Sequence, residues 1–264
     1  MITLLNGEHW GKEEILTRMY DDEFYYGHLG KYALSSSSLK TILKSPKTYR
    51  NVLKYGDDNN DSPALAAGKL VHWMILEPHK IDKLQFVDAS TKNTNKYKEA
   101  KEKYGEVFLA KERSAAERLA DAVLRNEAAI KLLNKSEFEV PAIEMYEGLA
   151  FRGKADIIQG DTIIDLKTSA DLSTFKYSAD KYGYDLQAWL YLKLFDKKNF
   201  VFLVVDKAST DIGLFDVSDD FLKRGENKFR QAVDNYKYFF EQDNDLDQYV
   251  MRGILWNYLK MTGV

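Results

Sequence analysis

The sequence contains no cysteine, which excludes disulfide bonds, thiolate zinc sites, iron–sulfur clusters and cysteine nucleophiles together. It also lacks an apolar run long enough to span a membrane, since the longest, Phe200–Val205, has only the length of a strand. No basic region followed by an apolar one opens the chain, so we expect no signal peptide. A cytoplasmic protein without a membrane partner is the simplest expectation.

An excess of basic residues is absent too, because the 264 residues carry a formal net charge of −3. This argues against a protein that coats nucleic acid through surface charge alone, but it allows basic groups confined to one groove. There is no internal repeat and no low-complexity linker, and 45% of the residues are hydrophobic, enough for one large core. We expect a single domain over 1–264, with an extension at 1–33, a core at 34–242 and a docking segment at 243–264.

A β-hairpin is predicted over residues 151–168, where apolar and polar residues alternate on both sides of Gly160-Asp161. The two-residue turn fixes a register in which Asp156 lies directly opposite Asp165. Two carboxylates in that position, with Cβ atoms about 5 Å apart, destabilise a strand pair. A hard cation such as Mg²⁺ reverses the sign of the interaction, because it takes carboxylate oxygens as ligands.

Lys167 shares a strand face with Asp165 and, in this register, lies opposite Lys154. Beside a bound ion its amine would orient or deprotonate a water molecule, or balance the charge of a phosphate. The alternative is a solvated polar face with a Lys–Asp pair, which is common. The facing acidic pair makes the first interpretation the more specific one.

Two predicted helices carry polar residues on apolar surfaces. His72 is the strongly polar residue in the middle of an apolar helix over 63–77, where a hydrogen-bonded core histidine is the usual interpretation. Gln187 and Tyr191 share one face of a helix over 182–195, and buried groups of this kind need hydrogen-bond partners. From the residues alone, a structural network would satisfy them.

Taken together, Gly153-Lys-Ala-Asp156, Asp165-Leu-Lys167 and Gln187-x-x-x-Tyr191 resemble the core of the PD-(D/E)xK nucleases, in their RecB-like branch. The closer similarity is to the RecE-type phage and prophage exonucleases, and it extends from Ser35 to about Phe240. The resemblance implies an α/β fold with a restriction-endonuclease-like core, in which helices flank a mixed central sheet.

The resemblance also implies the site. Asp156, Asp165 and the main-chain carbonyl of Leu166 would hold Mg²⁺, for which Mn²⁺ would substitute, and His72 would complete the ligand set. Lys167 would activate water. Gln187 and Tyr191 would border the active site and contact the lysine, a metal-bound water or DNA.

Candidate DNA contacts are less specific. Arg152 and Lys154 share a strand face with the acidic pair and would contact phosphate, or else balance charge. Ser35 and Ser37 lie where a serine caps a helix that ends before Pro46, and a hydroxyl-rich helix N-terminus also binds phosphate.

The implied activity is digestion of linear duplex DNA from its 5′ ends, leaving 3′ tails for recombination or phage DNA metabolism in a bacterial host or phage-infected cell. Such enzymes often form rings and work with a single-strand annealing protein. An endonuclease on the same core and a non-catalytic DNA-end-binding scaffold are the alternatives. The intact Asp156, Asp165, Lys167 and Gln187 count against the scaffold.

Three features stay open. Glu144, on a first core strand over 136–146, and Glu77 are possible further ligands that alternation does not place. The aromatic residues of 1–33 fit core packing or a subunit contact. Residues 91–101 lack apolar periodicity and are expected to form a basic loop, solvated or against DNA.

Overall fold

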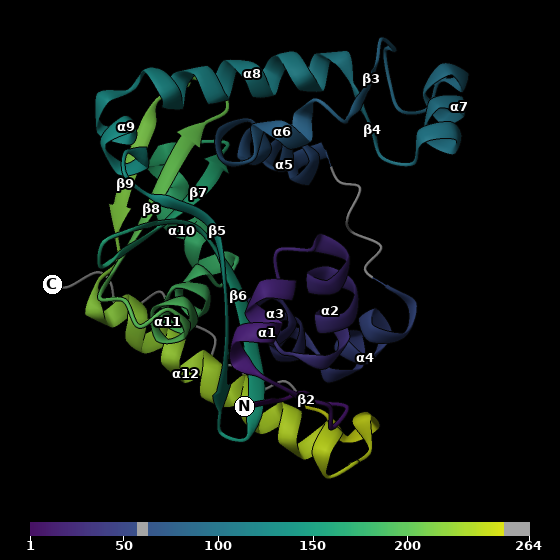
Figure 1. The fold of residues 1–264 in the computed structure, drawn as a ribbon, viewed down its shortest axis with the longest axis vertical. Coiled ribbons are helices and arrows are strands. Elements are labelled where there is room, and N and C mark those ends of the chain that lie inside the picture. The colour runs from purple at the N-terminus through teal and green to yellow at the C-terminus, as the bar shows by residue number, and fades with distance from the viewer. Residues whose placement is uncertain (57–62, 251–264) are drawn as a thin grey trace, which may run out of the picture.

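The computed structural model describes residues 1–56 and 63–250 and shows a five-stranded sheet between two layers of helices (Figure 1). The strands follow one another in chain order across the sheet: β5 (Glu137–Tyr146), β6 (Leu149–Gln159), β7 (Thr162–Ser169), β8 (Asn199–Asp206) and β9 (Ile212–Asp216). Neighbouring strands are antiparallel except β7 and β8, which are parallel. A parallel pair needs a crossover connection. Here it contains the 3₁₀ turn Leu172–Thr174 and the helices α10 (Phe175–Lys181) and α11 (Tyr184–Leu194). The predicted mixed sheet flanked by helices is confirmed.

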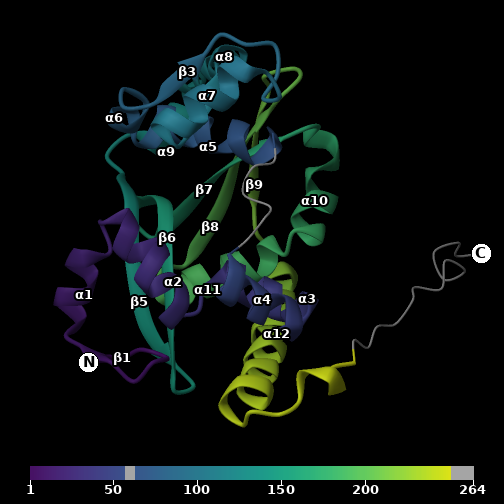
Figure 2. The ribbon, with the colours of Figure 1, turned by 90° about the vertical axis from the view of Figure 1, so that its right-hand side faces the viewer.

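The inner strand β8, between β7 and β9, is apolar on both faces, so helices must cover each face. Phe200, Phe202 and Val204 pack in a cluster with α3 (Ser36–Lys44), α4 (Pro46–Tyr55), α11 and α12 (Asp219–Tyr236). The alternate residues, Val201, Leu203 and Val205, pack with α5 (Pro63–Leu76), α8 (Ala110–Arg125) and α9 (Glu127–Leu133). Figures 1 and 2 show the two helical layers on opposite sides of the sheet.

The hairpin β6–β7 has the predicted turn and the predicted register at its closed end. Gly160 has a φ of +55°, a conformation that glycine adopts without strain. The ladder pairs are Ile157 with Ile164, Ile158 with Ile163 and Gln159 with Thr162. The two pairs expected beyond them are wrong as ladder pairs: Asp156 is not paired with Asp165, nor Lys154 with Lys167. The physical reason is that the Asp156 carboxylate takes a main-chain partner on β7 itself, the N–H of Leu166, at 2.9 Å.

The N-terminal segment packs along the far ends of β5 and β6 rather than in the main core. It comprises β1 (Ile2–Thr3), β2 (His9–Trp10), α1 (Lys12–Arg18), a π-helix (Glu23–His28) and α2 (Leu29–Tyr32). Its aromatic residues differ in burial. Phe24 and Tyr25 are buried in a cluster with Ile143, whereas Tyr20 and Tyr26 are exposed.

The C-terminal part of the described chain returns to α3 and α4. After α12 come a π-helical turn (Lys237–Glu241) and a 3₁₀ turn (Leu246–Gln248). Tyr249 Oη donates to the carbonyl of Leu43 at 3.1 Å, and Lys47 forms an ion pair with Asp247. The remainder of the expected docking segment, 251–264, lies outside the described residues.

Between α5 and α8 lies a small unit that the sequence did not predict. It consists of α6 (Pro78–Ile81), β3 (Gln85–Val87), α7 (Asn95–Tyr104) and β4 (Val107–Leu109), and β3 and β4 pair in parallel. The loop expected at 91–101 is wrong from Asn95 onward, because Thr94 caps α7 and Tyr97 Oη donates to the Val107 carbonyl at 2.9 Å. In the described part of the chain, no helix has both the length and the apolar character of a membrane span.

Candidate active site

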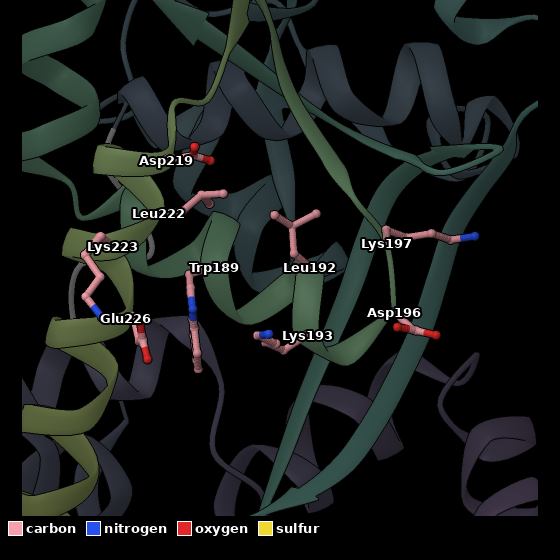
Figure 3. Close-up of a pocket in the computed structure, with 9 residues that line it drawn as sticks. All are labelled: Trp189, Leu192, Lys193, Asp196, Lys197, Asp219, Leu222, Lys223 and Glu226. Carbon is pink, nitrogen blue, oxygen red and sulfur yellow. Dashed lines mark hydrogen bonds and ion pairs between the residues drawn. The ribbon is translucent and has the colours of Figure 1, made fainter.

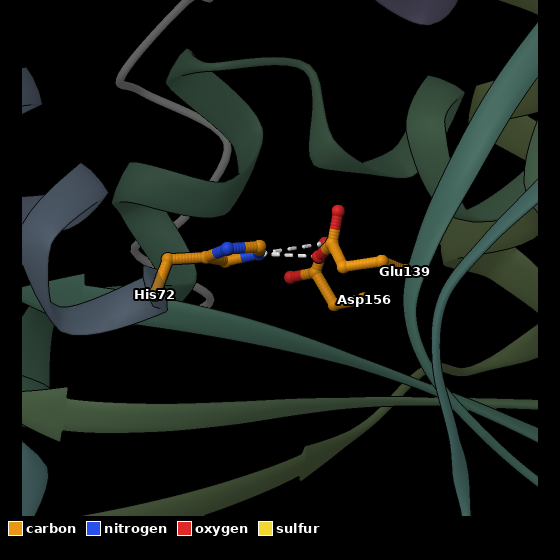
Figure 4. Close-up of side chains that lie close together, drawn as sticks. All are labelled: His72, Glu139 and Asp156. Carbon is orange, nitrogen blue, oxygen red and sulfur yellow. Dashed lines mark ion pairs between the residues drawn. The ribbon is translucent and has the colours of Figure 1, made fainter. Parts of the chain in front are cut away.

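A histidine and two carboxylates converge beside the open end of the hairpin (Figure 4). His72 projects from α5 toward Asp156 on β6 and Glu139 on β5. His72 Nε2 lies 3.1 Å from Asp156 Oδ1 and 3.4 Å from Glu139 Oε1. The side chains of both acids are only 15% exposed. Two carboxylates are therefore held close together, largely out of water.

The register of β5 and β6 explains why Glu139 reaches this position. Phe138 pairs with Ile157 and Val140 with Ala155, so Glu139 stands opposite Asp156. Its φ of +54° interrupts the ladder, and this left-handed conformation is uncommon for a residue with a side chain. The structure thus places Glu139, which was not predicted, opposite Asp156 across β5 and β6, whereas the predicted ladder pair of Asp156 with Asp165 is absent from the β6–β7 register.

Asp165 is the most buried acid of the site, at 1% exposure, and it has two partners. Gln187 Nε2 donates to Asp165 Oδ1 at 2.7 Å, and Lys167 forms an ion pair with Oδ2. Tyr191, one turn after Gln187, is buried against β6, where a Cβ on Gly153 would lie 3.0 Å from its Cε1. The structure therefore brings Asp156, Asp165, Lys167, Gln187 and Tyr191 to one region.

The pKa values of three groups in the site, His72, Glu139 and Asp165, are raised. Burial works to lower the pKa of His72, but Asp156 and Glu139 together raise it to about 9. Burial, reinforced by Asp156, raises the pKa of Glu139 to about 7 and that of Asp165 to about 6. These shifts show how costly it is to keep the acids ionised without an added positive charge.

The residues present fit a divalent cation. His72, Glu139 and Asp156 each offer a ligand atom, and these atoms lie within 4.8 Å of one another. Glu139 Oε1 is buried and accepts no hydrogen bond from the residues that the structure describes. A buried carboxylate oxygen without a donor is costly unless a cation satisfies it. Carboxylates suit Mg²⁺ and Mn²⁺, and a lone imidazole beside them is compatible with either.

The predicted phosphate contacts on β6 are placed unfavourably for that role. Arg152 is 8% exposed, and its Nε donates to the Leu29 carbonyl at 3.1 Å while its guanidinium covers the ring of Tyr25. Lys154 has a side chain 8% exposed, paired with Asp22 at 3.2 Å. Both charges are occupied by the N-terminal segment.

The sequence left two roles open for the serines at the start of α3, which were helix capping and phosphate binding. Ser35 is the N-cap, its Oγ accepting from the N–H of Ser38 at 3.3 Å, so capping accounts for it. Ser37 is exposed in the first turn.

The structure also shows where Glu144 and Glu77 lie, the two glutamates that the sequence left open as further ligands. Glu144 is not part of the cluster, since it forms an ion pair with Lys12 on α1. Glu77 lies at the edge of the site, where its charge raises the pKa of Glu139, and it is paired with Lys80 at 2.9 Å. Glu139 was not predicted, because Glu144 was the acidic residue of that predicted strand taken as the candidate ligand. An acidic residue that completes the register opposite Asp156 was the one available signal.

A separate hollow of about 350 Å³ lies between α11 and the first half of α12 (Figure 3). Its walls carry mixed charges, including Lys193, Lys223 and Glu226, together with Trp189. None of the predicted site residues lines it. The hollow is thus distinct from the acidic cluster.

Comparison with solved structures finds proteins that are similar to this chain. A crystal structure from Eubacterium rectale described as "Putative exonuclease" superposes with a TM-score of 0.67 at 16% identity, over 92% of this chain and 97% of that one. A phage related exonuclease from Haemophilus somnus 129PT gives a TM-score of 0.37 at 15% identity, over 83% and 100% of the two chains. No curated protein matches the sequence.

At this identity the first likeness establishes the fold alone, a mixed sheet with flanking helices. The model of one protein family, described as "PDDEXK-like domain of unknown function (DUF3799)", matches residues 35–246, most of the chain and all of the candidate site. This protein therefore belongs to that family of PDDEXK-like domains.

Proposed function

We propose that this protein is a metal-dependent exonuclease that hydrolyses linear duplex DNA from its 5′ ends and leaves 3′ single-stranded tails. One observation carries the proposal: Asp156, Asp165, Lys167 and Gln187 lie together beside a histidine–carboxylate cluster, on a PDDEXK-like fold. A structural polar face would not bury so many charges around one point.

Asp156 and Asp165 are the residues that would hold a divalent cation, with His72, Glu139 and the main-chain carbonyl of Leu166 as further ligands. When bound, Mg²⁺ or Mn²⁺ supplies Lewis-acid stabilisation of the phosphate charge and a more acidic water. The hydrogen bond from Gln187 fixes the orientation of Asp165, and that from the Leu166 N–H fixes Asp156.

Lys167 is best suited to act as a cation. Burial opposes its charge, but in the metal-free site Asp165 and Asp156 raise its pKa above the ordinary lysine value. Lys167 would orient the attacking water and balance charge on the phosphate. Hydrolysis joins the water oxygen to phosphorus and breaks the bond from phosphorus to the 3′ oxygen, which gives a 5′-phosphate product.

Exonuclease action is supported by the RecE-like motifs and by the description of the similar Eubacterium rectale protein. The chain is weakly acidic overall, so we propose that cationic groups are concentrated where DNA binds. A ring of subunits around the DNA and a single-strand annealing protein as partner complete the proposal.

The test is nucleotide release from linear duplex DNA labelled at either its 5′ or its 3′ ends, with Mg²⁺, with Mn²⁺ and with EDTA. Early release of the 5′ label alone, with closed circular DNA left intact, is the expected result. Cleavage of closed circles would point to an endonuclease instead. DNA binding without cleavage under every metal condition would leave only an end-binding scaffold.

A further inference from the structure

The site contains a second lysine that the sequence motifs do not include. Lys40 lies on α3, and its stem passes over the turn that begins α11. A Cβ on Gly183 would come within 3.1 Å of Lys40 Cδ, and Gly183 itself has a φ of +61°. Only glycine provides both that backbone conformation and the space for the lysine stem.

The ammonium of Lys40 is directed to the same aromatic ring as that of Lys167. Lys40 Nζ lies 5.9 Å from the ring centre of Tyr184, and Lys167 Nζ lies 5.1 Å from it. The two cations therefore flank one side chain at the border of the acidic cluster. A DNA strand that presents a phosphate to Lys167 would pass close to Lys40 as well.

Lys40 differs from its cationic neighbours in having no carboxylate partner among the described residues. Asp165 is paired with Lys167, and Asp185 with Lys228 at 2.7 Å. Lys40 is nevertheless only partly exposed, and burial followed by repulsion from Lys167 lowers its pKa to about 8. A half-buried cation without a counter-ion costs stability, and an anionic ligand would offset that cost.

We propose that Lys40 binds the backbone phosphate next to the scissile phosphodiester, on the strand being digested. The inference rests on the proposed nuclease function and adds a substrate-binding residue to it. Lys40 would supply the positive charge that Arg152 and Lys154, both occupied by the N-terminal segment, do not present.

The experiment measures single-turnover cleavage of linear duplex DNA in Mg²⁺ by the wild type and by Lys40→Met, Lys40→Gln, Lys40→Arg and Lys44→Met. Lys44 lies on the same helix but is exposed, which makes it the matched control. The half-saturating enzyme concentration is followed over a salt series. A parallel series of substrates carries one neutral methylphosphonate at successive positions near the 5′ end. Thermal unfolding verifies that each variant is folded.

We expect Lys40→Met and Lys40→Gln to raise the half-saturating concentration roughly tenfold and to reduce the salt slope by about 0.9, the value of one lost phosphate contact. Lys40→Arg should restore most of the affinity, and Lys44→Met should match the wild type. The methylphosphonate next to the scissile bond should weaken the wild type but have no further effect on Lys40→Met.

Wild-type affinity and salt slope in both neutral variants would overturn the role of Lys40, as would a methylphosphonate penalty that adds to the Lys40→Met penalty at every position. Failure of the proposed function itself would look different. In that case the wild type and the Lys44→Met control would also leave the DNA uncleaved.

Discussion

The candidate site is defined by which carboxylates lie together. Glu139 and Asp156 face each other across β5 and β6, and His72 approaches both from α5. The His72 cation offsets part of their repulsion, but one buried oxygen of Glu139 has no hydrogen-bond donor within 1–56 and 63–250. A divalent ion would therefore stabilise the folded state by binding it preferentially.

Replacing Glu139 by glutamine should separate metal binding from folding. We expect Glu139→Gln to lower the affinity for Mn²⁺ on the order of 10- to 100-fold, the range for groups that tune a metal site. In EDTA the variant should be at least as stable as the wild type, because repulsion with Asp156 is lost. Calorimetric titration and thermal unfolding measure the two effects.

Glu144→Gln is the control, because Glu144 lies on the same strand but pairs with Lys12. Equal Mn²⁺ affinity in Glu139→Gln and the control would exclude Glu139 from the ligand set.

The shifted pKa of Lys40 predicts a pH-dependent stability. Lys167 and Lys228 lower its proton affinity, Asp165 and Asp185 raise it, and burial dominates, so the folded pKa of about 8 lies below the ordinary 10.5. Between these values the unfolded chain binds more protons than the folded one, and stability from this group rises with pH. The wild type should therefore gain stability relative to Lys40→Met between pH 7.5 and 9.5.

Urea unfolding at both pH values measures the difference in the free energy of unfolding between the wild type and Lys40→Met. Groups that titrate equally in the two proteins cancel from this difference. A difference that is constant with pH would contradict the assigned environment of Lys40. The exposed Lys44, replaced in the same way, should show no such change.

At the residue scale, strand periodicity predicted residues of the hairpin in the candidate site, but not the contacts around them. Strand alternation and a two-residue turn singled out Asp156, Asp165 and Lys167, although the ladder pairing expected for them ends at Ile157 and Ile164. Glu139 was not identified, although the β5–β6 register, continued from the turn at Glu147-Gly148, places it opposite Asp156. The partners of Arg152 and Lys154 come from a segment more than 100 residues away and were equally invisible.

At the scale of elements, the packing of α12 against α11 fixes the helix that carries Gln187 and Tyr191. Gly225 is the point of closest approach, since a Cβ there would lie 2.1 Å from the main-chain oxygen of Asp185. The buried Asp185 side chain then pairs with Lys228 from α12. The position of Gln187 thus depends on a glycine far from the site in sequence.

Gly225→Ala should be strongly destabilising, because the clash is with backbone rather than with a flexible side chain. We expect a loss of about 1–3 kcal/mol or more in the free energy of unfolding, as for overpacked cores. Gly27→Ala, at another helical glycine with open space around it, should be close to neutral. Denaturant midpoints of the two variants test the prediction, and equal midpoints would contradict it.

Elements with strong end signals were predicted well. The helices α3 and α5 begin or end at a capping serine or a proline, and their predicted bounds agree with the structure to within one residue or so. The three-residue strands β3 and β4 and the charged helix α7 were not predicted. Strands of three residues are too short to show an alternating pattern, and Tyr97 is the buried residue of the otherwise charged α7.

At the scale of the whole molecule, the order of elements carried the prediction further than any single motif. A hairpin, a crossover helix and a continuous apolar strand require a mixed sheet with helices on both faces, and the structure confirms this. The same fold persists in a protein with 16% identity. What the order of elements could not give is the way the N-terminal segment packs, since its contacts are not local.

The most direct test of the central claim, metal-dependent hydrolysis at the acidic cluster, compares two aspartates of one hairpin. Nucleotide release from linear duplex DNA is measured in Mg²⁺ and in EDTA for the wild type, Asp156→Asn and Asp161→Asn. Asp161 lies in the exposed turn and pairs with Lys198 at 3.0 Å, away from the cluster. We predict that wild type and Asp161→Asn cleave DNA in Mg²⁺ only, and that folded Asp156→Asn does not. Cleavage by Asp156→Asn at the wild-type rate, or by the wild type in EDTA, would contradict the account.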